Sequence, residues 1–321
     1  MDITLNPEKV YVCTIEDYDG LKDHVPKLVG VDLKHPIDPQ LILCVEEIEG
    51  WLCNNEEQGE ELAYQIDSFI RRWQSTKQTH LMSHEKWSNN CILNMPAFQK
   101  RAKSINTLQD VDRLDNSLVL GNGPSIDTNM DWLKANHKDY NVIACWHVIR
   151  KLLDNGIRVD YVAHVDGVTP IFGEVPPLAK ETKLVTLPTA SHEFIQSYPD
   201  NDIYLHVEEN RHCSQAVATV LDMPLNEPVY GTVVYLQCLA AVQLRSKSLT
   251  LIGVDLTARP GEETENEDAF SQYVNSLSHI SRQYETFTKL YNASGGKQIP
   301  GFEDIKLDGS HPFGRSEAGQ S

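Results

Sequence analysis

Short apolar runs alternate with helical patterns from about residue 118 onward. The runs are rich in β-branched residues with few polar interruptions, which is typical of strands buried on both faces of a parallel sheet. We predict such strands at SLVLG, NVIACW, YVAHVD, KLVTLP, DIYLHV and LTLIGVDL. Apolar residues at helical spacing predict helices over 127–137, 147–155, 232–245 and 277–291. This alternation predicts an α/β fold, a Rossmann-like, doubly wound, mostly parallel sheet over residues 116–307.

The first part of the chain has a different texture. KVYVCTI and LILCVEEI are typical of strands, whereas the stretch GEELAYQIDSFIRRWQSTK has helical spacing. We therefore predict an N-terminal accessory α/β or helical region over residues 1–86 and a helical connector over 87–115. The last residues, 308–321, are predicted to be a disordered tail. The helical spacing is carried by Leu62, Ile66, Phe69, Ile70 and Trp73.

Composition and charge exclude several classes of partner. The 321 residues are 40% apolar and 23% charged, as in an ordinary globular protein, and the formal net charge is −18. Such a chain carries no general attraction for nucleic acid or anionic lipid. No apolar run approaches the length of a membrane span, and the start MDITLNPEKV lacks the pattern of a signal peptide. Seven scattered cysteines favour reduced thiols, so we expect a cytoplasmic protein, with a homo-oligomer left open.

The stretch LVLGNGPSID carries the most specific chemistry. It places a turn after a predicted strand, where nucleotide phosphates bind in parallel sheets. Gly121 and Gly123 allow close backbone approach, Asn122 offers an amide, and Ser125 is placed to act as helix N-cap. A tight turn that only connects two elements is the alternative. A standard NAD site is disfavoured, because the dinucleotide pattern needs glycine at position 126, where this chain has isoleucine.

Several blocks follow one another in a known order: WSNNCILNMPAFQKRAKSINTL, LVLGNGPSIDTNMDWL, GIRVDYVAHVDG, YGTVVYLQCLAAVQLRSKSLTLIGVDL and YNASGGKQIPGF. Between about residues 87 and 302 this order resembles the family of motility-accessory-factor flagellin glycosyltransferases and 6-hydroxymethylpterin diphosphokinases. Part of it is also similar to bacterial lipooligosaccharide sialyltransferases, which use CMP-sialic acid. The resemblance implies a nucleotide in the crevice and leaves the reaction open.

The sialyltransferase resemblance implies specific roles for site residues. It implies that Asn122 contacts the donor, that Gly121, Gly123 and Ser125 line its phosphate, and that His279 is the general base. A base is needed because the acceptor hydroxyl loses a proton as it attacks, and imidazole titrates near working pH. An ordinary surface histidine is the alternative for His279.

Further candidates lie at the ends of the predicted strands. Asp166 and Asp255 are candidates for nucleotide binding, Asp166 by holding a ribose or sugar hydroxyl. If the reaction were the diphosphokinase one, Asp166 would hold a metal ion, and Asp166 and Asp255 are the best candidates for holding Mg²⁺. A cap or turn role is the alternative for Asp255. Trp146 stands where the relatives commonly have an asparagine that contacts the nucleotide, so it is expected either to stack on the ligand or to close the pocket. The remaining nucleotide-binding candidates are Tyr230, Gly231 and Thr232, with Tyr235 expected to pack in the core.

The function that we predict is transfer of a nonulosonic-acid-type sugar from a CMP-activated donor to a glycan or protein hydroxyl, with no cofactor required. The first alternative is pyrophosphoryl transfer from ATP and Mg²⁺ to a pterin-like acceptor. The second is a non-catalytic nucleotide-binding or scaffold protein.

Overall fold

The computed structural model describes residues 6–31, 48–53, 55–168, 175–229, 232–257 and 267–307. The chain divides into two compact units, Met1–His84 and Glu85–Ser321. The predicted tail, 308–321, lies outside the described residues, as does most of the LILCVEEI stretch.

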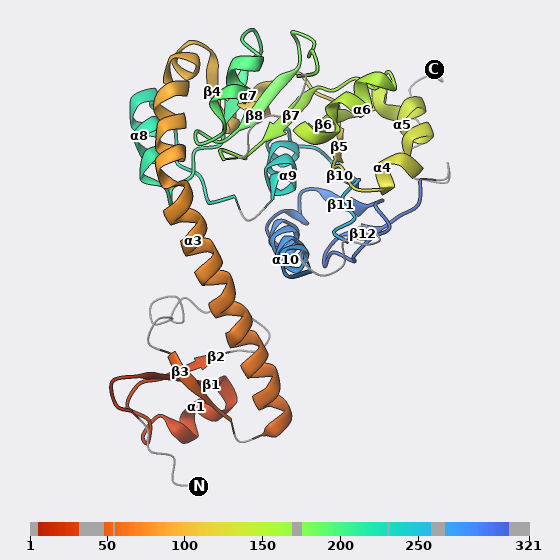
Figure 1. The fold of residues 1–321 in the computed structure, drawn as a ribbon. Helices are drawn as coiled ribbons and strands as arrows, with labels where there is room; N and C mark the ends of the chain where they lie inside the picture. Colours follow the sequence, from red (N-terminus) through yellow and green to blue (C-terminus); the bar gives the residue numbers. More distant parts are fainter. Residues whose placement is uncertain are drawn as a thin grey trace. The chain divides into compact units, whose positions relative to one another are not determined.

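The first unit is a small parallel sheet with strand order β2-β1-β3 (Figure 1). Helix α1 begins directly after β1, and the Oγ1 of Thr14 caps it by accepting a hydrogen bond from the Asp17 amide at 3.3 Å. Val12 and Val31 pack against Leu62 and Ile66 of helix α3 in the core of this unit. The elements are β1 (Val10–Thr14), α1 (Ile15–Leu21), β2 (Leu28–Val31), β3 (Ile48–Leu52) and α3 (Glu56–Arg101).

The helix predicted from the 62–73 spacing is confirmed as part of α3, which continues to Arg101. Its last turns belong to the second unit. There Cys91 and Phe98 are buried, and two asparagines hold loops of the sheet. Asn90 donates from Nδ2 to the carbonyls of Gly167 (2.9 Å) and Thr189 (3.0 Å), and Asn94 donates to the carbonyl of Ala190 (3.0 Å).

The second unit is built on a nine-stranded sheet in the order β12-β11-β10-β5-β6-β7-β8-β9-β4, and every paired strand in it is parallel. The chain moves outward from β5 to β9 and then returns to the other side of β5 with β10. This order confirms the predicted α/β, Rossmann-like, doubly wound fold. The strands are β4 (Ala102–Ser104), β5 (Asn116–Leu120), β6 (Asn141–Cys145), β7 (Tyr161–His164), β8 (Lys183–Thr186), β9 (Ile203–Leu205), β10 (Ser248–Ile252), β11 (Lys289–Asn292) and β12 (Glu303–Asp304).

Alternate residues of each strand face opposite sides of the sheet, as the period of two requires. Leu118 and Leu120 enter a core that α3, α5, α6, α7 and α8 cover. Val119 enters the second core, beneath α9 and α10. Burial on both faces explains why the strands are almost continuously apolar in sequence. The helices are α4 (Ser125–Thr128), α5 (Met130–Asn136), α6 (Ile149–Asp154), α7 (His192–Ser197), α8 (His212–Leu221), α9 (Val233–Gln243) and α10 (Glu267–Tyr284), with short 3₁₀ turns at Ile105–Asp110, His137–Asp139 and Trp146–Val148.

The prediction for 277–291 is wrong at both ends. Helix α10 begins at Glu267, and residues 289–291 belong to strand β11. Helical spacing continues by coincidence from Leu277 through Tyr284 to Tyr291, but Tyr291 pairs with Thr250 in the sheet. Tertiary pairing therefore overrides a local pattern here. The helix predicted over 127–137 is also interrupted, because it divides into α4 and α5.

The connector predicted over 87–115 is not purely helical. It contains β4, whose Ala102 pairs with Ile203 of β9 at the edge of the sheet. A three-residue strand is too short to show a periodicity, so the sequence pattern could not reveal it.

None of the described helices combines the length and the hydropathy that crossing a bilayer requires.

Candidate functional site

The turn after β5 packs directly against the turn after β10. The Gly121 amide donates to the carbonyl of Ile252 (2.8 Å), and the Gly123 amide donates to the carbonyl of Gly253 (2.7 Å). A Cβ at Gly121 would lie 2.2 Å from the Gly253 oxygen, and one at Gly123 would lie 2.1 Å from the Asp255 carboxylate. Close packing of two turns therefore accounts for both glycines.

Asp255 places a carboxylate at the start of α4. Its Oδ2 accepts hydrogen bonds from the Ser125 hydroxyl (2.9 Å) and the Ser125 amide (3.2 Å). The same Ser125 hydroxyl accepts a hydrogen bond from the Gly253 amide (2.9 Å). Burial raises the pKa of Asp255, against the opposing effect of its hydrogen bonds from Ser125. The chain's own carboxylate thus takes the position at which a ligand phosphate was expected.

The prediction that Ser125 is the N-cap of this helix is wrong. Ser125 is the first residue of α4, and Pro124 takes the capping position without a side-chain hydrogen bond. Pro124 already has a helical backbone, with φ −56° and ψ −33°, so Ser125 lies within the first helical turn. The capping role passes to Asp255, which lies in the turn after β10 and reaches Ser125 with its carboxylate.

A third turn joins this arrangement from β11. The Lys297 amide donates to the carbonyl of Asp255 (2.9 Å), and a Cβ at Gly296 would lie 1.9 Å from that oxygen. Ser294 accepts a hydrogen bond from the Val254 amide (3.0 Å). Asn122 is exposed at the tip of the β5 turn. Of the predicted phosphate-binding group, Asn122 alone keeps an exposed side chain.

Trp146 packs into an aromatic cluster. Its ring meets Phe194 at 5.9 Å and Tyr198 at 6.0 Å, both edge to face, and it is half-buried. The ring of His164 also stacks on the Phe194 ring, with 4.4 Å between the ring centroids. Burial lowers the pKa of His164 to about 4. These contacts favour a packing role for Trp146.

Asp166 shapes the turn after β7. Its Oδ1 accepts from the Val168 amide (2.7 Å), and its carbonyl accepts from the Ser191 amide (3.0 Å). Its partner in the Mg²⁺ hypothesis, Asp255, is engaged with Ser125. No group of three or more acidic, histidine or cysteine side chains that could hold a metal ion occurs among the residues with described positions.

Helix α9 starts at the same edge of the sheet. Gln237 donates from Nε2 to the carbonyls of Leu120 (3.1 Å), the last residue of β5, and Ile143 (2.9 Å). Thr232 caps the helix by accepting from the Val234 amide at 3.3 Å. Tyr230 and Gly231 lie outside the described residues. The positive end of an eleven-residue helix thus lies beyond the carboxyl end of β5.

His279 on α10 faces α9 and a carboxylate. Its ring stacks on Tyr235 at 6.4 Å, and its Nε2 lies 3.9 Å from Oε2 of Glu227. Tyr235 is 1% exposed, which confirms the expected packing role, whereas the His279 side chain is 35% exposed. Gln283 donates to the same Glu227 oxygen (3.1 Å). An imidazole held between an aromatic ring and a carboxylate is equipped to accept a proton.

A second polar group follows β9 and is built around Arg211, a residue whose partners the sequence did not predict. The Nε of Arg211 lies 2.8 Å from the buried Glu208 carboxylate, and its guanidinium lies 4.3 Å above the Trp87 ring. Burial raises the pKa of Glu208, although Arg211 opposes the shift. Glu208 in turn accepts from the Val229 amide (2.9 Å). Only the tertiary fold brings Trp87, Glu208 and Arg211 together, so no spacing signal reveals the group.

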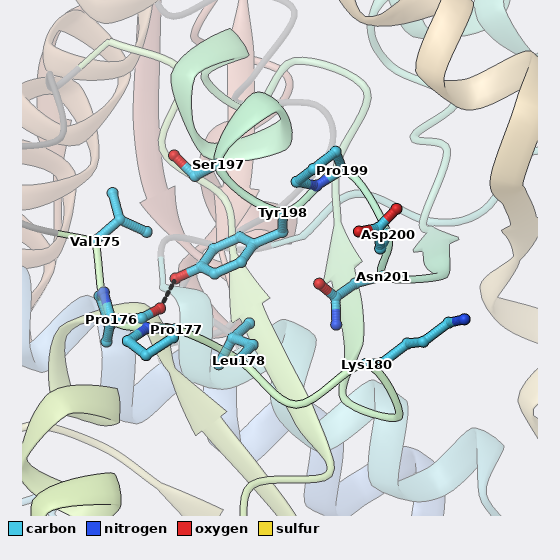
Figure 2. Close-up of a pocket in the computed structure, with 10 residues that line it drawn as sticks. All are labelled: Val175, Pro176, Pro177, Leu178, Lys180, Ser197, Tyr198, Pro199, Asp200 and Asn201. Carbon is cyan, nitrogen blue, oxygen red and sulfur yellow. Dashed lines mark hydrogen bonds between the residues drawn. The ribbon is translucent and has the colours of Figure 1, made fainter.

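A pocket of about 350 Å³ lies elsewhere (Figure 2). It is lined by residues 175–180 and 197–201, which precede β8 and β9, and the Tyr198 hydroxyl donates to the Pro176 carbonyl across it (3.2 Å). None of the predicted site residues lines it. Its position, before the strands rather than after them, separates it from the crevice that the topology predicts.

Comparisons with known proteins agree with the fold. A family model described as 6-hydroxymethylpterin diphosphokinase MptE-like matches residues 89–261, more than half of the chain. The MAf glycosyltransferase from Magnetospirillum magneticum AMB-1 superposes with a TM-score of 0.59 at 15% identity, over 91% of this chain and 50% of that one. The chain thus spans half the length of that protein, and at this identity the likeness concerns the fold alone. A search of curated proteins found no match.

Two sialyltransferase structures have lower scores. A mutant of the alpha-2,3/8-sialyltransferase CstII has a TM-score of 0.30 at 14% identity, over 59% of this chain and 86% of that one. CstII from Campylobacter jejuni in complex with a substrate analogue, cytidine-5'-monophosphate, has a TM-score of 0.28 at 14% identity, over 59% of this chain and 84% of that one. The family match confirms the family resemblance stated from the sequence blocks.

Proposed function

The chain belongs to the 6-hydroxymethylpterin diphosphokinase MptE-like family, and from that premise we propose that it is a nucleotide-dependent transferase of the glycosyl-transfer type. The donor that we propose is a CMP-activated nonulosonic-acid-type sugar, and the acceptor is a glycan or protein hydroxyl. The observation that carries the proposal is the pairing of His279 with Glu227, 3.9 Å apart, beside the start of α9.

In the proposed reaction, the acceptor oxygen attacks the anomeric carbon of the donor. The bond from that carbon to the CMP oxygen breaks, and CMP leaves with the electron pair. His279 takes the acceptor proton, and the Glu227 carboxylate, 3.9 Å from its Nε2, stabilises the imidazolium that forms. Because the leaving group carries one phosphate, we propose that this transfer needs no metal cofactor.

The proposed nucleotide site differs from the one that the turn alone suggested. Asp255 occupies the start of α4, so we place the phosphate at the first turn of α9, near Thr232 and the neighbouring Tyr230 and Gly231. Asn122 is exposed at the tip of the adjacent turn and is proposed to contact the ribose or base through its amide. The site would then be supported by a layer of residues that do not contact the ligand: Gly121, Gly123, Ser125 and Asp255.

The experiment measures CMP release from CMP-N-acetylneuraminate and CMP binding by calorimetry, for the wild type and three variants. We expect His279→Ala to lower kcat by about 10²-fold or more with CMP affinity unchanged, since only the proton transfer is lost. Glu227→Gln should lower kcat by less. His24→Ala, an exposed histidine in the first unit, is the matched control and should behave as wild type. Normal turnover in His279→Ala would refute the base assignment.

The family description favours a second candidate, pyrophosphoryl transfer from ATP to a pterin-like alcohol. The same assay distinguishes it: Mg²⁺-dependent formation of AMP from ATP and a hydroxymethylpterin, with no release of CMP, would replace the glycosyl-transfer proposal. Binding of CMP without turnover of any donor would instead favour a non-catalytic nucleotide-binding protein.

A further inference from the structure

Arg211 follows strand β9 at the carboxyl edge of the second unit's sheet, and contacts from three directions hold its guanidinium. Its Nε lies 2.8 Å from Oε2 of Glu208, whose side chain is fully buried. The central carbon of the guanidinium lies 4.3 Å from the centre of the Trp87 ring. Nη1 donates to the Thr189 hydroxyl (3.4 Å). A guanidinium held in this way presents its remaining N–H groups in one fixed direction.

The end of this guanidinium keeps unused hydrogen-bond donors. A guanidinium has five N–H groups, and the contacts of Arg211 engage only Nε and one hydrogen of Nη1. In the described part of the chain, Nη2 has no hydrogen-bond acceptor. The side chain is 17% exposed, although its Nε is buried. The two terminal nitrogens are therefore available to an anion, and their parallel N–H groups match the two oxygens of a carboxylate.

One backbone segment connects Arg211 with the proposed base. Glu208, the ion-pair partner of Arg211, accepts a hydrogen bond at Oε1 from the Val229 amide (2.9 Å). Two residues earlier on the same segment, the Glu227 carboxylate lies 3.9 Å from Nε2 of His279. The segment reaches the N-cap of α9 three residues after Val229. The guanidinium is thus tied to the segment that carries the partner of the base and leads into the proposed phosphate site.

The proposed donor contains an anionic group that the site described so far does not bind. A CMP-activated nonulosonic acid carries a phosphodiester and, on the anomeric carbon, a carboxylate. The start of α9 is proposed for the phosphate, and the carboxylate still requires a partner. Because the chain has a net charge of −18, its overall field does not attract such a ligand, and a cation inside the site is needed.

We propose that Arg211 binds the carboxylate of the sugar donor through Nη1 and Nη2 and thereby selects acidic sugars. This inference rests on the proposed function and deepens it. Glu208 and Trp87 orient the guanidinium, so little side-chain freedom is lost when the donor binds. A nucleotide sugar without the carboxylate leaves these N–H groups without an acceptor and binds more weakly.

The experiment measures, by calorimetry on the full chain, the binding of CMP-N-acetylneuraminate and of its methyl ester, in which the carboxylate is blocked. We expect the wild type to bind the acid about tenfold more tightly or better. The double variant Arg211→Gln/Glu208→Gln removes both charges, so no buried carboxylate is left unpaired. Its affinity for the acid should fall to that for the ester, with the affinity for the ester unchanged.

A matched control removes a similar ion pair at the other edge of the sheet. Arg158 precedes β7, and its Nε lies 2.7 Å from Oδ1 of Asp160. Arg158→Gln/Asp160→Asn should keep the wild-type preference for the acid. Arg211→Lys keeps a positive charge beside Glu208 but loses the two parallel donors, so the preference should fall at least about threefold. An unchanged preference in Arg211→Lys would overturn the two-oxygen contact.

The preference for the acid over the ester separates ligand binding from a structural role. If the double variant weakens acid and ester by the same factor, Arg211 only supports the fold and the inference is overturned. Equal binding of both compounds by the wild type overturns the carboxylate contact and leaves the proposed function standing, whereas binding of neither contradicts both. An acidic acceptor is the other source of a carboxylate. If the double variant keeps its donor preference but no longer prefers sialyllactose to lactose, the assignment to the donor is wrong.

Discussion

Each unit of this chain has a buried parallel strand that leads almost at once into a helix, and the two junctions are built differently. In the first unit, Thr14 ends β1 and caps α1 with its own side chain, and the junction contains no glycine. In the second unit, the turn over 121–124 separates β5 from α4, and the cap comes from Asp255, more than a hundred residues away in sequence. A cap from the adjacent residue, such as Thr14, does not require a second turn to pack against the junction. A cap from the turn after another strand, such as Asp255, requires glycines so that the two turns can pack closely.

A turn whose sequence is typical of phosphate binding can instead contact other parts of its own chain, as the β5 turn does here. Gly121 and Gly123 have the residue types that a phosphate would require, because in both cases an oxygen must approach the backbone closely. Here the oxygens belong to Gly253 and Asp255. Glycine in such a turn therefore indicates a close approach without saying what approaches.

The largest effect is expected from Gly121→Ala. The new Cβ would lie 2.2 Å from a backbone oxygen that cannot move without the β10 turn, so we expect a loss of about 3 kcal/mol in the free energy of unfolding of the second unit. Gly20→Ala in α1 is the control, since nothing lies within 4 Å of its Cβ, and the first unit should gain up to about 1 kcal/mol. Hydrogen exchange read by mass spectrometry reports on each unit separately. Equal effects of the two substitutions would contradict the packing account.

Removal of the distant cap should have the next largest effect. Asp255→Ala leaves the Ser125 amide and hydroxyl without their carboxylate partner, and we expect a loss of about 2 kcal/mol in the second unit. Exchange of the amides of α4 and of the β5 turn should accelerate first. If exchange in that segment is unchanged, Asp255 is not its cap.

The distant cap should also give the second unit a pH dependence of its own. Because the pKa of Asp255 is raised in the folded chain, its contribution to stability is present below the ordinary aspartate pKa and is lost as the pH rises through the folded pKa. We expect the difference in unfolding free energy between the wild type and Asp255→Asn to change across this range, by at most about 1.4 kcal/mol per pH unit. Urea titrations between pH 4 and pH 7 measure it. A difference that is constant across these titrations would show that burial does not govern the ionisation of Asp255.

The smallest effect is expected from Thr14→Ala. Loss of the local cap on α1 should cost about 1 kcal/mol in the first unit, with the second unit unchanged. Thr14→Ser should restore most of the stability, because a serine hydroxyl can accept the same hydrogen bond. Failure of serine to rescue would indicate that the methyl group of this fully buried threonine matters more than its hydroxyl.

Sequence patterns predicted the strands and helices whose conformation is reflected in local periodicity. The strands β5 to β10 and helix α9 are confirmed, because fully buried elements carry continuous apolar runs and no partner is needed to recognise them. The pattern missed β4 and mistook β11 for helix, since both owe their conformation to a neighbouring strand. In the same way, the turn sequence indicated Gly121 and Ser125 as special but could not show that Asp255 would reach them. The Glu227 partner of His279 also arises only from the fold.

The edge strand β4 gives the chain a distinctive order of assembly during synthesis. Ala102 pairs with Ile203, so the end of α3 and the strand after it leave the ribosome about a hundred residues before their sheet neighbour. At about 5–20 residues per second, this segment waits roughly 5–20 s with its strand unpaired. During that interval Asn90, Asn94 and Arg101 also lack the carbonyls that they hold in the finished protein. The first unit can therefore fold while β4, at the start of the second unit, still lacks β9, the strand with which it pairs.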